Sequence, residues 1–252
     1  STRAMALGWS RAGGHESFAA AIGSSSGSYG AIGANSVAIG YQSKASSGFG
    51  VAIGRSCQAG DTGFAAGSSA LATGAKAFSH GLNTTASASY SKASGREALA
   101  NIEGKSARAS GNFSAQGDAQ TGTFVLRADT TNATAEALTT NNSTAGTTNQ
   151  VVLPNNSVYG FTGTIIAREN SAATNDFAIW EVKGGAVRGS SASTTALGSH
   201  NINTISESTG AANWSIAISA DTTNGAIAFT VTGEASHSIR WVATINTTEV
   251  TY

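Results

Sequence analysis

Residues 31–54 read Ala-Ile-Gly-Ala-Asn-Ser-Val-Ala-Ile-Gly-Tyr-Gln-Ser-Lys-Ala-Ser-Ser-Gly-Phe-Gly-Val-Ala-Ile-Gly. The triplet Ala-Ile-Gly, together with looser versions of it, recurs through the first half of the chain, often at a spacing of seven residues. These units end on glycine, at Gly33, Gly40, Gly54, Gly67, Gly74 and Gly81. Self-similarity of this kind predicts a stack of equivalent structural units.

The seven-residue spacing also occurs in coiled coils, but the residue types exclude that fold. Heptad helices need large apolar side chains at two positions of each unit, and each glycine costs a helix about 1 kcal/mol. The repeated positions here are Ala, Gly and Ser. Short strands joined by tight turns fit the pattern, because glycine adopts positive φ at a corner. We therefore expect a β-solenoid in which the repeated glycines are structural residues.

The alternation inside one unit predicts two different faces. Val37 and Ile39 alternate with Ala38 and Gly40. Because bulky side chains fill an interior, we expect Val37 and Ile39 to point into the coil. The small residues would then lie on a surface that another backbone approaches closely, as in an assembly of three chains.

Residues 35–40, Asn-Ser-Val-Ala-Ile-Gly, followed by Ser-Lys-Ala at residues 43–45, resemble the head repeat of YadA-like trimeric autotransporter adhesins. The resemblance covers roughly residues 15–117, and the repeat is similar to segments of long bacteriophage tail fibres. It implies a left-handed parallel β-roll and an intertwined homotrimer of three rolls around a common axis. The sequence departs from the family in its irregular spacing after Gly54, and it lacks a glycine near Ser47 and Ala88.

Ordinary alternating strands replace the glycine repeat after about residue 118. We therefore expect two domains, residues 1–118 and residues 119–252. Alternation predicts strands at residues 124–128, 150–153, 159–168, 176–183, 214–220, 226–232 and 238–245. Such strands without helical periodicity indicate an antiparallel β-sandwich or a jelly roll in an all-β chain, and we take the β-sandwich as the prediction. Two polar connections, residues 129–149 and 190–210, are expected as exposed loops at its tip.

The second half also resembles the domain that precedes the self-cleaving chaperone in phage tail fibres. Residues 120–127, Gln-Thr-Gly-Thr-Phe-Val-Leu-Arg, and residues 239–243, Ile-Arg-Trp-Val-Ala, carry this resemblance. It implies that Tyr252 is a maturation end left by removal of a C-terminal chaperone. Trimeric fibres fold slowly through aggregation-prone species, so such assistance has a physical reason.

Composition narrows the classes of partner. The chain has 14 basic and 14 acidic residues, so a positive field for nucleic acid or for an anionic membrane surface is missing. No apolar run approaches the ~20 residues that span a bilayer, so membrane insertion is not expected. The single cysteine, Cys57, excludes an intrachain disulfide. A buried or otherwise inert thiol is the expectation there.

Catalytic and metal-binding signals are weak. His15, His80, His200 and His237 show no metal-ligand spacing, although stacking around a three-fold axis would allow an ion site. Glycan cleavage needs two positioned carboxylates. The nearest acidic pairs are Asp176 with Glu181 and Glu97 with Glu103, and neither spacing is diagnostic. We expect no enzyme activity, no cofactor and no metal.

Candidate receptor contacts come from the second half. Trp214 and Trp241 alternate with apolar neighbours and are expected in the core. Trp180 is a candidate receptor contact, although a core position is favoured for it by about two to one. Arg188, in a glycine-flanked stretch, is the polar residue chosen as a receptor contact; a plain surface charge is the alternative.

The two resemblances together imply a bacteriophage tail fibre of the virion that acts outside the cell. Its partner would be a glycan or an outer-membrane protein on the surface of a host bacterium, and three identical sites would make attachment firm. The alternatives are the head of a bacterial trimeric adhesin, a polysaccharide depolymerase, and a shaft spacer without recognition.

Overall fold

The computed structural model describes residues 3–23, 28–170 and 175–252. It divides into two compact units, residues 1–120 and residues 121–252. The fold is all-β, as predicted: within the described ranges the only helical segments are two 3₁₀ turns, η1 (Ala192–Thr194) and η2 (Thr209–Ala211). No helix in those ranges has the length and apolarity needed to cross a membrane.

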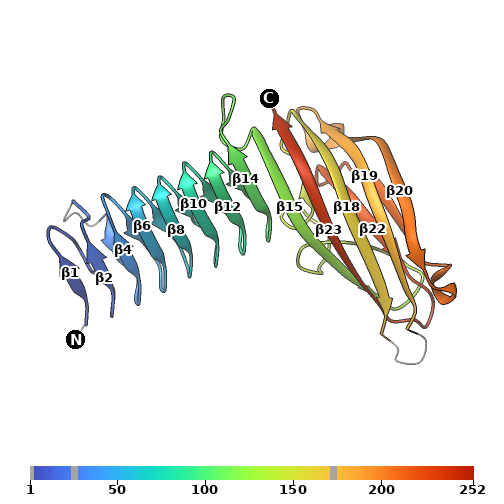
Figure 1. Ribbon diagram of the computed structural model, residues 1–252, viewed down its shortest axis with the longest axis horizontal. Helices are drawn as coiled ribbons and strands as arrows, with labels where there is room; N and C mark the ends of the chain where they lie inside the picture. Colours follow the sequence, from blue (N-terminus) through green and yellow to red (C-terminus); the bar gives the residue numbers. More distant parts are fainter. Residues whose placement is uncertain (1–2, 24–27, 171–174) are drawn as a thin grey trace. The chain divides into compact units, whose positions relative to one another are not determined.

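The first unit is a β-solenoid, which confirms the prediction from the repeat (Figure 1). Its strands form two parallel sheets. The first sheet runs β1 (Met5–Leu7), β2 (Phe18–Ala20), β4 (Val37–Ile39), β6 (Val51–Arg55), β8 (Phe64–Ser68), β10 (Phe78–Leu82), β12 (Lys92–Arg96) and β14 (Ser106–Ser110). The second runs β3 (Gly30–Ala31), β5 (Lys44–Ala45), β7 (Gln58–Ala59), β9 (Leu71–Ala72), β11 (Thr85–Ala86) and β13 (Leu99–Ala100). The coils from β2 to β13 each contribute one strand to each sheet, and β1 and β14 extend the first sheet at its two ends.

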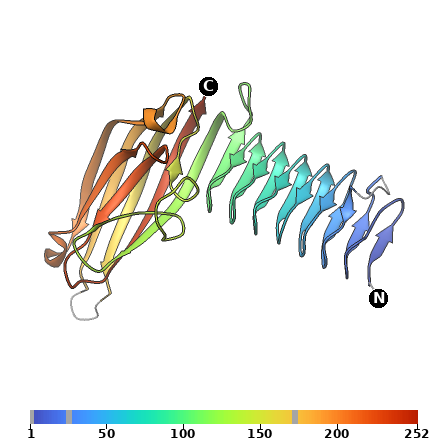
Figure 2. The same cartoon turned by 180° about the vertical axis from the view of Figure 1, so that it is seen from behind.

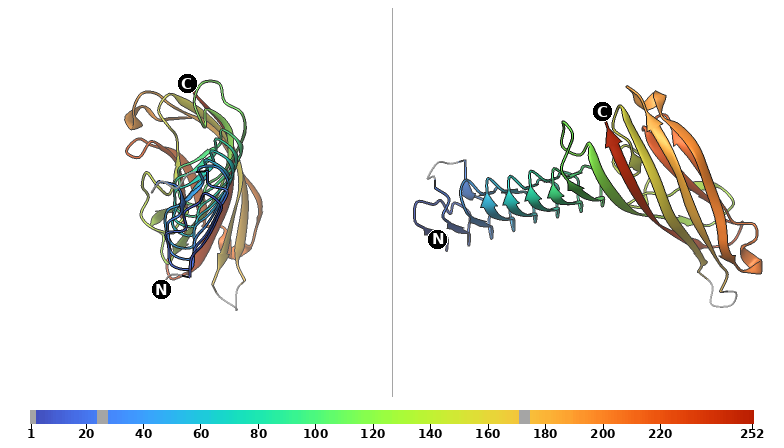
Figure 3. Two further views of the ribbon diagram at one scale, coloured as in Figure 1. Left: turned by 90° about the vertical axis from the view of Figure 1, so that its left-hand side faces the viewer. Right: turned by 45° about the horizontal axis from the view of Figure 1, so that its top comes forward.

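The register explains the seven-residue spacing as half a coil. Val37 pairs with Val51, and Phe64 pairs with Phe78, so one coil advances by 14 residues. Val51 pairs with Phe64, which is a coil of 13 residues. That shorter coil accounts for the irregular spacing after Gly54. Seen along the stack, the coils of this unit lie behind one another (Figure 3, left).

The interior of the solenoid is made of alanine, which corrects the predicted orientation of the two faces. Ala38 and Ala52 of the first sheet and Ala45 and Ala59 of the second are at most 1% exposed. Val37 and Ile39 are instead partly exposed on the outside. A coil of 14 residues brings its two sheets so close that only small side chains fit between them. The small residues therefore recur because one chain closes on itself.

Most of the repeated glycines lie where consecutive coils meet. A Cβ on Gly54, whose φ is +123°, would lie 2.0 Å from the carbonyl oxygen of Gly67 in the next coil. The same clash with the next coil, at 1.9–2.2 Å, would occur at Gly33, Gly40, Gly67, Gly74 and Gly81. The stacking continues through Ser47 and Ala88, where the repeat lacks a glycine.

The corners of the coils are built from other residues than glycine. Left-handed φ values between 51° and 59° recur once per coil in a column of exposed or half-buried side chains, at Asn35, Phe49, Thr62, Lys76 and Tyr90. The expectation that glycine supplies the positive φ of the corners is therefore wrong at these positions. Hydrogen bonds from each corner to the coil before it, such as Phe49 N–H to Ala34 O at 2.9 Å, hold this conformation.

The second unit contains two antiparallel sheets (Figures 1 and 2). The larger has the order β15 (Ala119–Thr130), β23 (Ile239–Thr251), β18 (Ser157–Glu169), β19 (Phe177–Arg188) and β20 (Ala196–Glu207). The smaller pairs β22 (Ala226–Thr232) with β16 (Ala135–Ala137), β17 (Val151–Val152) and β21 (Ser215–Asp221). The segment 190–210, expected as a loop, is mostly the edge strand β20. The segment 129–149 contains the short strand β16.

Aromatic side chains are packed in the core of this unit, both within the larger sheet and between the two sheets. Trp241 stacks on Trp180 with ring centroids 5.7 Å apart, and Trp214 lies 6.0 Å from Trp241. Phe161 of the larger sheet meets the edge of Phe229 of the smaller one at 5.4 Å. Trp214 and Trp241 are thus core residues, as predicted. Buried aromatic pairs contribute about 0.5–1.5 kcal/mol each beyond the burial of their area.

Candidate functional site

The larger sheet of the second unit has one face in the core and one face toward solvent. Along β18 and β23, buried and exposed residues alternate without interruption over most of the strand. On the outer face, hydroxyl and amide side chains of neighbouring strands stand side by side, because Thr162 pairs with Asn246 on one side and with Lys183 on the other.

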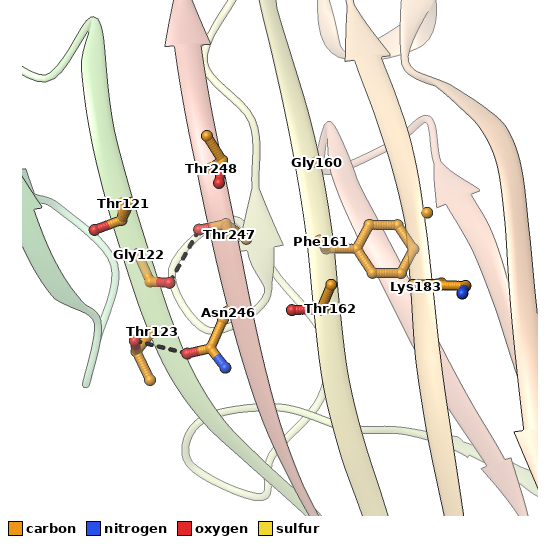
Figure 4. A pocket seen from close by; sticks show the side chains of 11 residues that line it. Thr121, Gly122, Thr123, Gly160, Phe161, Thr162, Lys183, Asn246, Thr247 and Thr248 are labelled. Atoms are coloured by element: carbon orange, nitrogen blue, oxygen red, sulfur yellow. Dashed lines mark hydrogen bonds between the residues drawn. The ribbon is translucent and has the colours of Figure 1, made fainter.

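A depression lies on this outer face and is lined by β15, β23, β18 and β19 (Figure 4). We call it the sheet-face depression. The side chains at its border that carry polar groups are Thr121, Thr123, Thr162, Lys183, Asn246 and Thr248. Its floor includes Gly160, which pairs with Gly185 of β19 and with Thr248 of β23. Two glycines in adjacent strands therefore leave two neighbouring positions without side chains, and the row continues with Thr248 on β23; we call it the glycine row.

The polar groups of the sheet-face depression are positioned by hydrogen bonds between strands. The Thr123 hydroxyl donates to Asn246 Oδ1 at 3.0 Å, which leaves the amide nitrogen of Asn246 directed away from that bond. Thr247 Oγ1 of β23 also lies 3.3 Å from the carbonyl oxygen of Gly122 on β15, a longer contact than the one that its proton makes with Glu249 Oε1 at 2.6 Å. The lining includes Lys183 as a cation and includes no carboxylate. The site can therefore donate and accept hydrogen bonds but has no general acid or base pair.

A row of valines borders the glycine row on its other side. Val158 is opposite both Val187 and Val250 in the sheet. These three side chains are 42–50% exposed. The outer face thus presents an apolar row, the glycine row and a polar row in succession.

On the core side of the same strands, a carboxyl group is buried beside a tyrosine. Glu249 is 2% exposed, lies opposite Tyr159 in the sheet and accepts a hydrogen bond from Thr247 Oγ1 at 2.6 Å. Burial, and next the charge of Glu249, raise the pKa of Tyr159 well above its usual value. Tyr159 is therefore a neutral hydrogen-bonding group below the floor of the depression.

The two candidate receptor contacts both lie partly or wholly inside the unit. Trp180 is 3% exposed and stacks on Trp241, so its ring has the core position favoured by the sequence. Arg188 is half-buried, and its Nη1 donates to the carbonyl of Leu153 at 2.5 Å. A weaker contact of 3.5 Å reaches the carbonyl of Gly225. The arginine thus links β19 to the segments that follow β17 and precede β22.

The histidines are dispersed, and within the described ranges no three His, Cys, Asp or Glu side chains form a metal-binding group. His237 Nδ1 lies 2.8 Å from Glu169 Oε1. His80 packs its ring against Phe78, and His15 and His200 are exposed. Cys57 is fully buried in the solenoid, as predicted, and burial raises the pKa of its thiol.

The acidic pairs do not form a glycosidase-like arrangement. Asp176 and Glu181 are five positions apart along an extended chain, which places them on opposite sides and about 16 Å apart. Asp176 Oδ1 accepts a hydrogen bond from Ser208 Oγ at 2.7 Å. Glu97 and Glu103 lie at opposite ends of β13, and Glu97 Oε1 accepts a hydrogen bond from Asn83 Nδ2 at 2.7 Å.

A second surface of interest is the outer face of the first sheet of the solenoid. Equivalent residues of successive coils form an in-register ladder of Phe18, Val37, Val51, Phe64 and Phe78. Phe64 and Phe78 stack with centroids 5.0 Å apart, and Lys92 Nζ lies 5.7 Å from the Phe78 ring. Beside this ladder, Ile39 pairs with Ile53, which is 37% exposed. We call these residues together the apolar ladder.

Sequence reasoning missed the sheet-face depression. Its residues come from four strands that are distant in sequence, so no spacing connects them. One local signal was present: Gly160 stands in an exposed position between Tyr159 and Phe161 of a clearly alternating strand. Glycine in a strand interior marks a bulge or a place where a ligand or another backbone comes close.

Comparison with known proteins assigns the chain to no family. No known protein family and no curated protein matches the sequence. Among solved structures, the Acinetobacter phage vB_ApiP_P1 tailspike protein shows a TM-score of 0.28 and 12% identity over 94% of this chain. The chain spans 48% of the length of that tailspike chain. A similarity this weak establishes neither a shared fold nor a shared function, and the resemblance to YadA-like head repeats stays a prediction.

Proposed function

We propose that the chain is part of a bacteriophage tail fibre in the virion that attaches to a receptor on the surface of a host bacterium. In this proposal the solenoid is a rigid shaft that assembles as a homotrimer. The second unit is an antiparallel β-sandwich that contacts a host glycan or outer-membrane protein. The observation that supports assembly best is the apolar ladder, because phenylalanine, valine and isoleucine are partly or fully exposed in register over successive coils.

Self-association is the simplest way to cover this ladder. Contiguous exposed apolar surface in a soluble protein marks an interaction site. A second and a third copy present the same ladder with the same coil-to-coil spacing, so the surfaces match repeat by repeat. Closed cyclic symmetry of identical chains also avoids open-ended aggregation. The resemblance to trimeric head repeats favours three copies over two.

Toward its end, the ladder becomes polar. The positions equivalent to Phe78 are Lys92 in the next coil and Ser106 in the coil after it. We therefore place the contact between copies along the coils up to Phe78, with the later coils meeting water.

The mass of the protein in solution tests the assembly. Light scattering should give a mass of three chains for the wild type, and Ile53→Lys should give single chains because it places a charge in the ladder. The matched control is Leu71→Lys, on the outside of the second sheet. A wild type that runs as one chain, or an Ile53→Lys variant that still forms trimers, contradicts the proposal.

Adhesion is tested with the same proteins on bacterial cells and on an array of bacterial surface glycans. The trimer should bind, and the monomeric Ile53→Lys variant should bind much more weakly, because three linked sites gain about 10²–10⁴ in avidity. Absence of binding of the trimer to any cell or glycan would count against attachment. The wider gene context, with virion genes or with a membrane-anchor gene, separates a phage fibre from a bacterial adhesin.

A further inference from the structure

We propose that the sheet-face depression is a saccharide-binding subsite and that Gly160 is kept small to admit the sugar. This inference rests on the proposed adhesive function and deepens it, since it names the place and the chemical class of the ligand. Three observations carry it: the open space above Gly160, the polar residues in the glycine row and in the row on one side of it, and the valines on the other side.

Gly160 is not explained by the fold. Among the glycines of residues 3–23, 28–170 and 175–252, it is the one that combines an ordinary φ with no atom within 4 Å of an added Cβ. Gly54 and its equivalents, in contrast, face the backbone of the next coil. Glycine weakens the interior of a strand because it has no side chain to pack and loses more entropy on folding. A ligand that needs the space accounts for a residue that folding does not require.

The border of the depression matches the chemistry of a sugar. Thr162, Asn246 and Thr248 are exposed and lie in neighbouring positions on β18 and β23. Hydroxyl and amide groups both donate and accept, which suits ring hydroxyls that do the same. On the far side of the glycine row, Val158 and Val250 offer apolar contact to the C–H face of a ring.

Other occupants fit less well. An extended peptide adds to a sheet through an unpaired edge, but β18 is paired along its length with β19 and β23. Nucleic acid needs a positive field, and Lys183 is the cation of the lining in a chain without net charge. A second copy of the chain would instead contact the apolar ladder, which is made of phenylalanine, valine and isoleucine and is more apolar than this mixed surface.

The depression is shallow, and the aromatic ring in its lining, Phe161, is 3% exposed and points into the core. A sugar would therefore bind without ring stacking, through hydrogen bonds and contact with valine. Single-site affinity should be low, and attachment would depend on several copies acting together. Binding should accordingly be measured on the assembled protein.

The first test places a side chain in the open space above Gly160, at the floor of the sheet-face depression. Gly160→Leu places a side chain where there is no neighbour, so the fold should persist, and circular dichroism verifies this. On an array of bacterial polysaccharides and oligosaccharides, we expect its binding to fall by about tenfold or more relative to the wild type. The matched control is Thr164→Leu, which adds the same side chain on the same face of β18 outside the lining. It should bind like the wild type.

A second variant addresses the hydrogen bonds. Thr162→Val keeps the shape and removes the hydroxyl, so it should weaken binding of the same glycans while unfolding at the temperature of the wild type. Equal binding by the wild type, Gly160→Leu and Thr162→Val overturns the subsite.

The outcomes separate this inference from the proposed function. If the wild type adheres to cells and glycans and Gly160→Leu adheres equally, the subsite is wrong and adhesion stands. If the wild type adheres to cells but binds no saccharide on the array, and protease treatment of the cells abolishes adhesion, the receptor is a protein and the saccharide inference fails. If the trimeric wild type adheres to nothing, both fail.

Discussion

At the scale of the residue, the glycines of this chain fall into two groups with different physical causes. Gly54 and its equivalents are required because consecutive coils approach within a distance that excludes a Cβ. Gly160 has free space and an ordinary φ, so folding does not require it. Sequence alone shows both as glycine. Only the surroundings of each Cα reveal which one is structural and which one leaves room for a ligand.

Replacement of a coil glycine should be costly. Gly54→Ala places a Cβ 2.0 Å from the Gly67 oxygen at a φ of +123°, so we expect a loss of about 2–4 kcal/mol in the free energy of unfolding. The control is Gly48→Ala, whose Cβ would meet its nearest atom, the Ala34 oxygen, at 3.6 Å. It should stay within about 0.5 kcal/mol of the wild type. Urea titration followed by circular dichroism measures both.

Asp118 provides a pH-dependent contact at the end of the solenoid unit. Its carboxylate accepts hydrogen bonds from the backbone N–H groups of Phe113, Ser114 and Ala115 at 2.7–2.9 Å. These bonds, led by the one from Ala115, lower the pKa of Asp118 below 3.8. A lowered pKa means that the stabilisation is fully present above the ordinary carboxyl range. It is lost as pH falls through the lower folded pKa.

The corresponding experiment compares melting temperatures between pH 2 and pH 7. Asp118→Asn should melt below the wild type at pH 7, and the difference should shrink as the pH falls below about 4, where Asp118 becomes protonated in the unfolded chain. A difference that stays constant across the whole range would show that charge is not the cause.

At the scale of the element, the solenoid strands are stable because an interior of alanine closes the space between two parallel sheets. Two neighbouring residues of one short strand should therefore differ in whether they tolerate replacement by a larger side chain. In β7, Ala59 is 1% exposed and Gln58 faces solvent. A narrow interior has no room for additional methylene groups, whereas the outer face has no such limit.

Ala59→Leu should destabilise the solenoid by about 1–3 kcal/mol or prevent its folding, because the side chain cannot be accommodated between the sheets. Gln58→Leu is the matched control, since it adds the same side chain one position away and lies opposite Leu71 of the next coil. It should change the free energy of unfolding by less than about 0.5 kcal/mol. Thermal unfolding monitored by circular dichroism distinguishes them. Equal effects would place the interior of the coil elsewhere.

At the scale of the whole molecule, the two units offer two kinds of surface. The solenoid carries an apolar ladder that suits other copies of the chain, and the second unit carries the sheet-face depression with hydroxyl and amide groups. We propose that assembly through the apolar ladder brings several copies of the sheet-face depression together in one molecule. In the proposed function, this division provides adhesion without a large net charge and without a metal group within the described ranges.

The same arrangement predicts binding without cleavage. No carboxylate lines the sheet-face depression, and Asp176 and Glu181 are on opposite sides of their strand. Incubation with a bound polysaccharide should therefore release neither reducing ends nor unsaturated products, as followed by a reducing-sugar assay and by absorbance of the product. Appearance of either product would identify a depolymerase. In that case Asp176→Asn and Glu97→Gln would be the first variants to examine.

The sequence by itself determined the fold class, because a period of two shows which residues share a face and small residues at a fixed spacing indicate units that stack closely on one another. It did not determine which face is inside. Val37 and Ile39 point outward and Ala38 inward because the distance between the two sheets of a coil, a tertiary quantity, admits only small side chains. The edge strand β20 was missed for a related reason: it buries almost nothing, so it carries no alternation.

The candidate site was also decided by tertiary structure. Trp180 and Arg188 were chosen as contacts for their residue types, but packing against Trp241 and a bond to the Leu153 carbonyl turn them inward. The sheet-face depression exists because four strands distant in sequence bring short polar side chains and Gly160 into adjacent positions. Pairing between distant strands is set by the register of the whole sheet, and no local pattern in the sequence encodes it.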